Sequence, residues 1–128
     1  MKPDTKQKVL LALYTEYQRD LPNFDDITAA SLGMNPDIFN ITIKKLQDEE
    51  LIGDVHLIWG EEKDSVPMGV VLSVCRLTRL GIDYVEKNFG IENGLPGRQK
   101  VIVLSTNFAD WGLQELNELA ARVLAEIT

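Results

Sequence analysis

Hydrophobic residues recur every three or four positions near the start of the chain, and this spacing predicts an amphipathic helix over residues 4–20. Asp4 and Gln7 are placed as a helix-capping pair, and Pro22 follows the end of the predicted helix. The side chains expected on its buried side are those of Val9, Leu10, Leu13, Tyr14 and Tyr17.

Two further helices are predicted before the pattern changes. Asp25 can cap a short second helix that reaches Leu32 and stops at Gly33. Asn35 suits the N-cap of a third helix, which has a proline at its first position and runs to Glu50. Two helices joined by a short glycine-containing turn are typical of a helix-turn-helix.

After the third helix, hydrophobic and polar residues alternate over residues 54–59, which predicts a strand. Residues 60–69 are rich in turn-forming residues, and residues 70–77 then predict a returning strand. Thr78 caps a fourth helix. The order helix, helix, helix, hairpin, helix predicts an α+β fold, a winged helix-turn-helix in which the hairpin is the wing. The buried side of the fourth helix is expected to hold Ile82, Val85 and Phe89.

The C-terminal part predicts an extension to this winged-helix domain of residues 1–90. Residues 91–98 contain Asn-Gly and Pro-Gly pairs and are expected to form a linker. Residues 99–128 would hold a short strand over 100–105 and a long amphipathic helix over 108–127. Both faces of the returning strand are apolar, so the extension is expected to cover it within the chain or across a homodimer. The candidate dimer-interface residues are Leu113, Leu116, Ala120, Val123 and Ile127.

Two stretches resemble the phage and bacterial YjcQ-type proteins. The segment PDIFNITIKKLQDEELIG, which starts at Pro36, resembles the family in the spacing of its apolar residues and in its closing Leu-Ile-Gly. The segment LTRLGIDYVEKN, which starts at Leu77, resembles the family's Leu-Thr-x-x-Gly-x-x-Tyr-x-x-x-Asn stretch. The resemblance covers residues 5–90 and implies a small, often phage-associated winged-helix protein without a known cofactor. Residues from Asn93 onward do not match the family pattern.

Composition narrows the class of protein. The chain has 128 residues, 45% of them hydrophobic, and a formal charge of −7, so we expect a folded protein that repels polyanions as a whole. Cys75 is the only cysteine, which excludes an intrachain disulfide and fits a reducing cytosol. Neither a signal peptide nor a membrane-spanning run is visible, and we therefore expect a soluble, cytoplasmic protein that does not enter a membrane.

The predicted third helix is the candidate contact element, because the side turned away from its apolar stripe would be free. In a winged helix this side can enter a DNA major groove, where lysine and asparagine meet phosphates or base edges. The alternative is an ordinary solvated face, in which Lys44 pairs with Asp48 and Lys45 with Glu49. The candidate contact residues are Asp37, Asn40, Ile41, Lys44 and Lys45.

Charge favours a protein partner over DNA. Residues 25–50 carry six acids against two lysines, a net charge of −4, and residues 60–69 carry three acids against one lysine, a net charge of −2. Phosphate neutralisation supplies most non-specific affinity for DNA, so both segments start with repulsion. Two hypotheses follow: a protein-interaction or regulatory module of phage or prophage type, and a sequence-specific DNA-binding transcriptional regulator.

Other chemistry finds little support. His56 is the only histidine, and with Cys75 it gives too few ligands for a metal site, so each is expected to have a structural role. Adjacent acids such as Glu49 and Glu50 point in different directions from a helix. Phosphate-binding loops and nucleophile elbows are not found, and the sequence implies no cofactor, metal or small-molecule substrate and no enzymatic activity.

Overall fold

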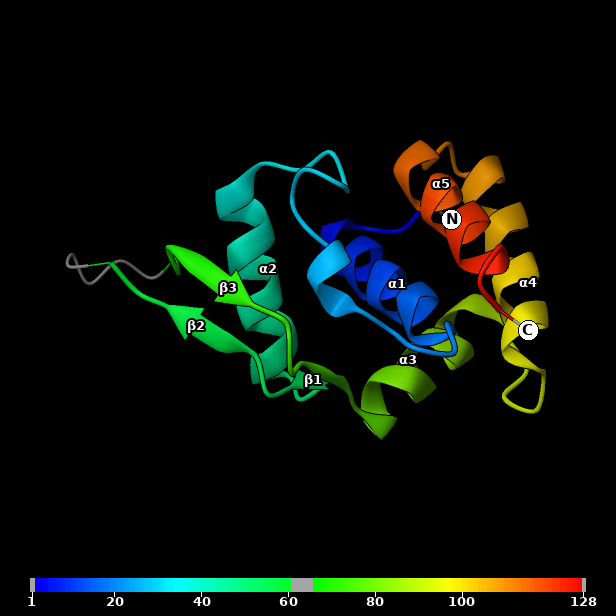
Figure 1. Cartoon of the computed structure of the whole chain (residues 1–128), viewed down its shortest axis with the longest axis horizontal. Helices are drawn as coiled ribbons and strands as arrows, with labels where there is room; N and C mark the ends of the chain where they lie inside the picture. Colours follow the sequence, from blue (N-terminus) through cyan, green and yellow to red (C-terminus); the bar gives the residue numbers. More distant parts are fainter. Residues whose placement is uncertain (1, 61–65, 128) are drawn as a thin grey trace.

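A computed structural model describes residues 2–60 and 66–127. In this part of the chain the fold is α+β, with five α-helices, one 3-10 helix and four short strands (Figure 1). The elements are α1 (Thr5–Tyr17), η1 (Phe24–Asp26), α2 (Pro36–Asp48), β1 (Ile52–Gly53), β2 (His56–Ile58), β3 (Gly69–Val71), β4 (Arg76–Leu77), α3 (Arg79–Phe89), α4 (Gly97–Asp110) and α5 (Gln114–Leu124).

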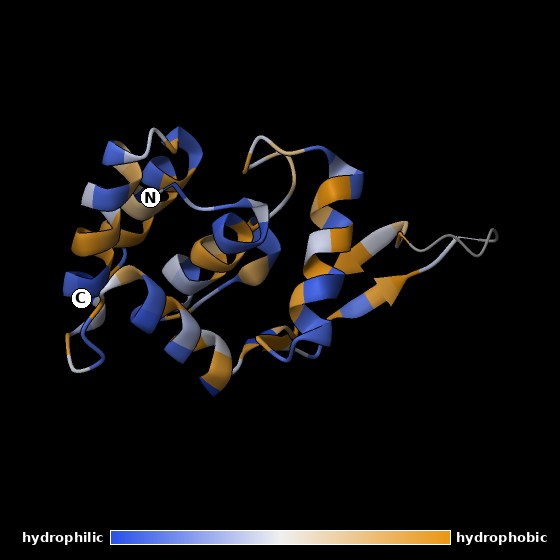
Figure 2. Ribbon diagram, turned by 180° about the vertical axis from the view of Figure 1, so that it is seen from behind, coloured by the Kyte–Doolittle hydropathy of each residue, from blue (hydrophilic) through white to orange (hydrophobic). Residues whose placement is uncertain are grey.

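Helix α1 lies in the middle of the molecule, between α2 with the hairpin on one side and α4 with α5 on the other (Figure 1). The predicted capping pair is confirmed: Gln7 N–H donates to Asp4 Oδ1 at 2.8 Å, and Asp4 N–H donates to Gln7 Oε1 at 3.0 Å. Every residue from Val9 to Glu16 is buried. The apolar surface of α1 is therefore used on all sides, and Figure 2 shows hydrophobic stretches in α1 and in the helices around it.

The prediction of a second helix from Asp25 to Leu32 is wrong. Only η1 is helical there, and the residues after it form turns. Thr28 and Ser31 account for the difference, since Ser31 N–H donates to Thr28 Oγ1 at 3.0 Å and Thr28 N–H donates to Ser31 Oγ at 2.9 Å. This reciprocal capping pair makes Thr28 the start of a new turn, which ends at Gly33 at φ +63°, and so interrupts the predicted helix in its middle. Ile27 and Leu32 are nevertheless buried in the core, whereas Ala30 is exposed.

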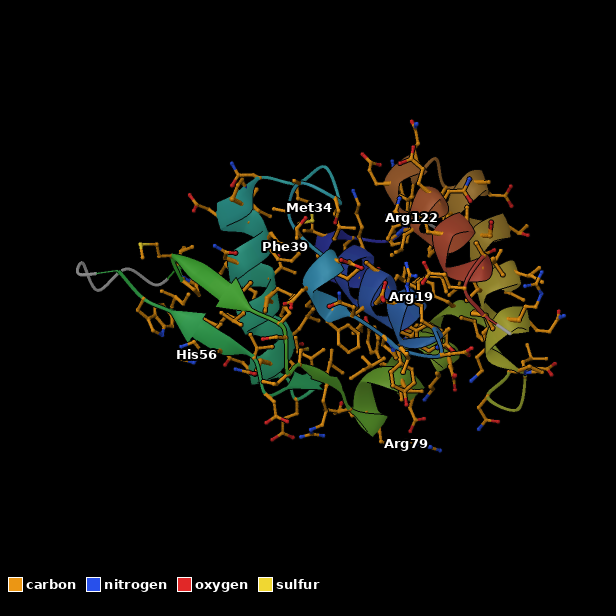
Figure 3. All side chains as sticks on the ribbon, in the orientation of Figure 1. Arg19, Met34, Phe39, His56, Arg79 and Arg122 are labelled. Carbon is orange, nitrogen blue, oxygen red and sulfur yellow. The ribbon has the colours of Figure 1, made fainter. Side chains whose placement is uncertain are left out.

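Helix α2 begins as predicted and ends at Asp48, two residues earlier than expected. Asn35 caps it by accepting hydrogen bonds from the N–H groups of Asp37 at 2.9 Å and Ile38 at 3.2 Å. The apolar stripe packs inward, and Phe39 points from α2 toward α1 (Figure 3). The buried residues of this stripe are Phe39, Ile43 and Leu46.

The predicted hairpin is present as two short antiparallel ladders, β1 with β4 and β2 with β3. Asp54, at φ +61°, separates them on the outgoing strand, and a turn from Leu72 to Cys75 separates them on the returning strand. This turn breaks the alternation, so that Leu72 and Cys75 are both buried while Val74 is 69% exposed. The expectation that both faces of residues 70–77 need a cover is therefore wrong. Residues 61–65, which carry the predicted wing charges, lie outside the described residues.

Helix α3 starts in close contact with the backbone of Leu51, just before β1. Thr78 caps it by accepting from Gly81 N–H at 3.0 Å, and its hydroxyl donates to Leu51 O at 2.9 Å. A Cβ added at Gly81 would lie 2.1 Å from that same Leu51 oxygen. The glycine is thus required by the distance between α3 and the backbone before β1.

We expect Gly81→Ala to lower the free energy of unfolding by about 1–3 kcal/mol, because α3 must move away from Leu51 O to admit a methyl group. Urea denaturation followed by circular dichroism measures the loss. Gly94→Ala is the matched control, since a Cβ at Gly94 meets nothing within 4 Å. Equal stability of the two variants would contradict the close contact.

The C-terminal part differs most from its prediction. Residues 100–105 belong to α4 and not to a strand, and the predicted helix over 108–127 is split between α4 and α5. Val101, Leu104 and Phe108 are fully buried along one side of α4, which extends the helical stripe backward through the β-branched run. Gly112 at φ +70° ends the turn after α4, and Leu113 N–H donates to Phe108 O at 2.9 Å.

Helices α4 and α5 form a helical hairpin that packs on α1 at the end of the molecule opposite the β-hairpin (Figure 1). The predicted linker is shorter than expected, because α4 already begins at Gly97. Ile91 is 4% exposed, and its N–H donates to Glu86 O at 2.9 Å. The connection is therefore anchored to the core at its first residue.

Candidate interaction surface

The five candidate contact residues of α2 have different environments. Asp37 and Lys45 are exposed, while Ile41 and Lys44 are half-buried on the same side of the helix. Asn40 is only 9% exposed, and its Nδ2 donates to the carbonyl oxygens of Pro67 and Met68, each at 3.3 Å. The expectation that Asn40 lies on the free face is wrong, because the returning arm of the hairpin covers it.

Two of the charges on α2 are neutralised by the chain itself. Lys44 Nζ lies 2.5 Å from Asp48 Oδ2, which confirms the predicted pair. The predicted pair of Lys45 with Glu49 is wrong, because Glu49 instead binds Lys6 of α1, with Nζ 2.8 Å from Oε1. The hydrogen bond to Glu49 raises the pKa of Lys6. Lys45 is left without a hydrogen-bond or ion-pair partner among the described residues.

A hollow of about 300 Å³ lies where the segment around η1, the start of α2 and β3 meet. Polar and apolar groups contribute about equally to its walls, and Met68, with 68% of its surface exposed, stands at its rim. The residues that line it are Asp25, Ile27, Thr28, Ala29, Phe39, Asn40, Met68, Gly69, Val70 and Leu72. Sequence reasoning did not find the hollow, because the wall around β3 comes from a part of the chain distant from the other two walls.

Large exposed apolar side chains occur on α2 and near the β2–β3 ladder, as they do elsewhere at Leu21 and Val74. Ile38 on α2 is 50% exposed, and Trp59 and Met68 beside the β2–β3 ladder are 46% and 68% exposed. Met68 N–H donates to Ile58 O at 2.7 Å, so the two arms of the hairpin are paired up to this point. Large exposed apolar residues on adjoining elements are a feature of protein contact sites. We call Ile38, Ile41, Trp59, Met68 and the hollow the α2–hairpin surface.

The C-terminal stripe is occupied within the chain. Leu116, Ala120 and Val123 are fully buried, Leu113 is 7% exposed and Ile127 is half-buried against the core. Packing of α5 on α1 and α4 therefore accounts for the stripe that had predicted a dimer interface. A dimer through these residues would require the helical hairpin to leave α1, so the homodimer prediction draws no support from them.

A buried acidic network ties α1, α3 and α4 together. Tyr14 donates to Glu86 Oε2 at 2.6 Å, and Lys100 Nζ lies 2.6 Å from the same oxygen. Burial and the hydrogen bond to Glu86 raise the pKa of Tyr14. Burial pushes the pKa of Glu86 upward, but the hydrogen bonds from Lys100 and Tyr14 outweigh it and place this pKa below its ordinary value. The contacts of Glu86 with Tyr14 and Lys100 fit a structural role for this carboxylate.

A second buried carboxylate lies at the end of α1. Glu16 is fully buried, Arg19 Nε is 2.8 Å from its Oε2 without hydrogen-bond alignment, and Asn23 N–H donates to the same oxygen at 2.9 Å. Arg19 also pairs with Glu126 beyond α5. Figure 3 shows Arg19 at the end of α1 and Arg122 on α5. The Arg19–Glu126 pair fixes the C-terminal residues to α1, and nothing in the local sequence signals it.

His56 and Cys75 occupy structural positions. His56 lies exposed on β2, at the outer side of the hairpin (Figure 3). Cys75 is buried, and burial raises the pKa of its thiol to about 11, so the reactive thiolate is scarce at neutral pH. In the part of the chain that the structure describes, no three His, Cys, Asp or Glu side chains gather as metal ligands.

The sequence matches no protein-family model, and no curated protein or solved structure shows significant similarity to it. Among the described helices, none combines the length and the apolar character that crossing a membrane requires.

Proposed function

We propose that this protein is a non-enzymatic winged-helix module that binds another protein through the α2–hairpin surface. The observation that carries the proposal is the hollow between η1, α2 and β3, with the exposed Met68 at its rim. Protein interfaces depend on a few side chains that fill such hollows, surrounded by apolar contacts that exclude water. The YjcQ-type resemblance agrees with a winged helix and remains a prediction.

DNA binding is the second candidate, and the environment of Lys45 favours it. Because Glu49 binds Lys6, Lys45 is an exposed cation without an acidic partner in the described part of the chain. Against this, Lys44 is paired with Asp48, and Asn40 is held by the hairpin and does not reach a groove. One free lysine supplies little of the charge that phosphate contacts need. The protein partner is therefore the first candidate.

Replacing Ile38 and Met68 together by aspartate is expected to lower capture of the partner at least about tenfold, because hot-spot side chains carry most binding energy. Both side chains are at least half exposed, so the fold should persist. Immobilised wild type and variant are compared by quantitative mass spectrometry of the proteins retained from cells. Ile102→Asp is the control, since Ile102 is 38% exposed on α4 at the other end of the molecule.

The DNA hypothesis is tested on the same proteins by gel shift against genomic fragments at about 50 mM salt, where charge contacts are strongest. The proposal expects no shifted band. Salt-sensitive binding that is lost in Lys44→Glu with Lys45→Glu, while the Ile38 and Met68 variant still binds, would reverse the order of the two candidates.

A further inference from the structure

We propose that the hollow beside β3 is the anchor site for a basic side chain of the partner, arginine above lysine. This inference rests on the proposed function and adds the chemistry of the group that is recognised. A volume of about 300 Å³ lies at the lower end of the range for ligand pockets, which suits one long side chain.

The walls of the hollow fit the aliphatic stem of such a side chain. Ile27, Phe39 and Leu72 are 2%, 3% and 3% exposed, and they give the hollow an apolar floor. Basic side chains bury their methylene groups against surfaces of this kind while the charged head stays at a polar site. The floor alone would accept any apolar group, so the polar groups decide the choice.

The polar side chains at the hollow offer acceptors. Asn40 directs Nδ2 to the carbonyl oxygens of Pro67 and Met68, which leaves Oδ1 as its remaining group. No donor among the described residues reaches this Oδ1, and Asn40 is 9% exposed. The carboxylate of Asp25 is likewise without an ion-pair or hydrogen-bond partner there. An acceptor that an occupant covers and leaves unpaired costs binding energy, so the occupant should bring donors.

Charge selects a cationic donor over a neutral one. Asp25 stands at the hollow, and among the described residues that line it there is no lysine or arginine to offset its charge. An anionic group would be repelled, and an apolar group would leave Asp25 and Asn40 unpaired. A guanidinium suits the site best, because its fork of five donors can serve two separate acceptors, whereas an ammonium is a compact point charge.

The test uses three probes of similar length: n-butylguanidinium, n-butylammonium and the neutral n-pentanol. Titrations of the full chain are followed by two-dimensional NMR of the backbone amides. Butylguanidinium is expected to give saturable shifts at Thr28, Ala29 and Val70, with weaker binding of butylammonium and the weakest of pentanol. Equal binding of pentanol, or shifts confined to other parts of the chain, would overturn the inference.

Asp25→Asn is expected to weaken butylguanidinium binding about threefold or more, as the loss of a partly exposed charge pair implies. Asp110→Asn is the matched control, because Asp110 is an exposed acid at the end of α4. An unchanged affinity in the Asp25 variant, with its NMR spectrum otherwise intact, would also overturn the inference.

A peptide arm identifies the source of the cation. Acetyl-Ala-Arg-Ala-amide should shift the same amides as butylguanidinium, whereas acetyl-Ala-norleucine-Ala-amide should not. Binding of the small cation without the arginine peptide would contradict a partner side chain as the occupant. If no cation binds but Ile38→Asp with Met68→Asp still abolishes capture, the anchor fails and the proposed function stands. Cation binding without an effect of those substitutions on capture gives the reverse outcome.

Discussion

Replacing Arg19 with methionine is expected to lower the free energy of unfolding by about 3–5 kcal/mol, the usual cost of leaving a buried charge without its partner. Glu16 is fully buried, and apart from Arg19 its described contacts include only one hydrogen bond, from Asn23 N–H. Its Oε1 has no hydrogen-bond partner among the described residues. The loss is large against the total stability of an ordinary domain, about 5–15 kcal/mol.

Urea denaturation measures this loss, with circular dichroism and tryptophan fluorescence as the two signals. Trp111 packs edge-to-face on Phe89 at a ring distance of 5.6 Å, so it reports on the junction of α3 and α4. Arg122→Met is the matched control, since Arg122 is an exposed arginine on α5, and it should change stability by about 0.5 kcal/mol or less. Similar losses in both variants would contradict the role of the Glu16–Arg19 pair.

A double substitution separates the pair from its surroundings. Glu16→Gln with Arg19→Met removes both charges, while the glutamine can still accept from Asn23 N–H. We expect the double variant to be more stable than Arg19→Met alone, because replacing a buried ion pair by neutral groups costs less than breaking it. Additive losses would show that the two side chains act independently.

The second large effect is expected at the Glu86 network, where Lys100→Met should lower stability by about 3 kcal/mol at neutral pH. Glu86 is 6% exposed and would keep only the hydroxyl of Tyr14 as a described side-chain donor. Lys87→Met is the matched control, since Lys87 is an exposed lysine on α3 directly after Glu86. Equal stability of the two variants would show that the contact of Lys100 with Glu86 does not hold α4 against α3.

The pH dependence of stability gives an independent reading of the same network. The pKa of Glu86 is lower in the folded protein than its ordinary value, so its stabilisation is fully present above about 4.3 and is lost as the pH falls through the folded value. The pKa of Tyr14 is raised, so its stabilisation is present below about 10 and is lost above that pH. Lys100→Met should make the acid loss shallower, and an unchanged acid limb would contradict this.

The sequence predicted the elements whose signals are local. Asp4, Asn35 and Thr78 were each identified as helix caps, and each accepts the hydrogen bonds expected of a cap. The hairpin was predicted from alternation and turn residues, which are also local. The second helix failed for a local reason that periodicity does not detect, the exchange of hydrogen bonds between Thr28 and Ser31.

The errors at the C-terminus come from reading two patterns separately. Val101 and Val103 are β-branched and suggested a strand, but Val101, Leu104 and Phe108 already have helical spacing. The break at Gly112 was missed because the apolar stripe of α5 continues in phase across it. Short apolar runs fit a strand and a buried helix equally well, and only the partner surface decides between them.

The candidate site could be predicted only in part, because its decisive contacts join distant segments. A helical projection placed Asn40 beside the free face, and only the position of the returning hairpin arm shows that Pro67 and Met68 cover it. Likewise, Lys45 lost its expected acid to Lys6, a residue 43 positions away from Glu49. The exposure of Ile38 could not be predicted for the same reason, because it depends on the side from which α1 packs on α2.

The enclosure of α1 has a consequence for how the chain can be divided. Eight consecutive residues, from Val9 to Glu16, have no outward face, since α2 and α3 cover one flank and α5 covers the other. The buried residues on both sides of α1 belong to one continuous core cluster. The stretch around residue 91 is therefore a turn between helices and not a domain boundary. Cutting the chain there would divide one hydrophobic core between two fragments.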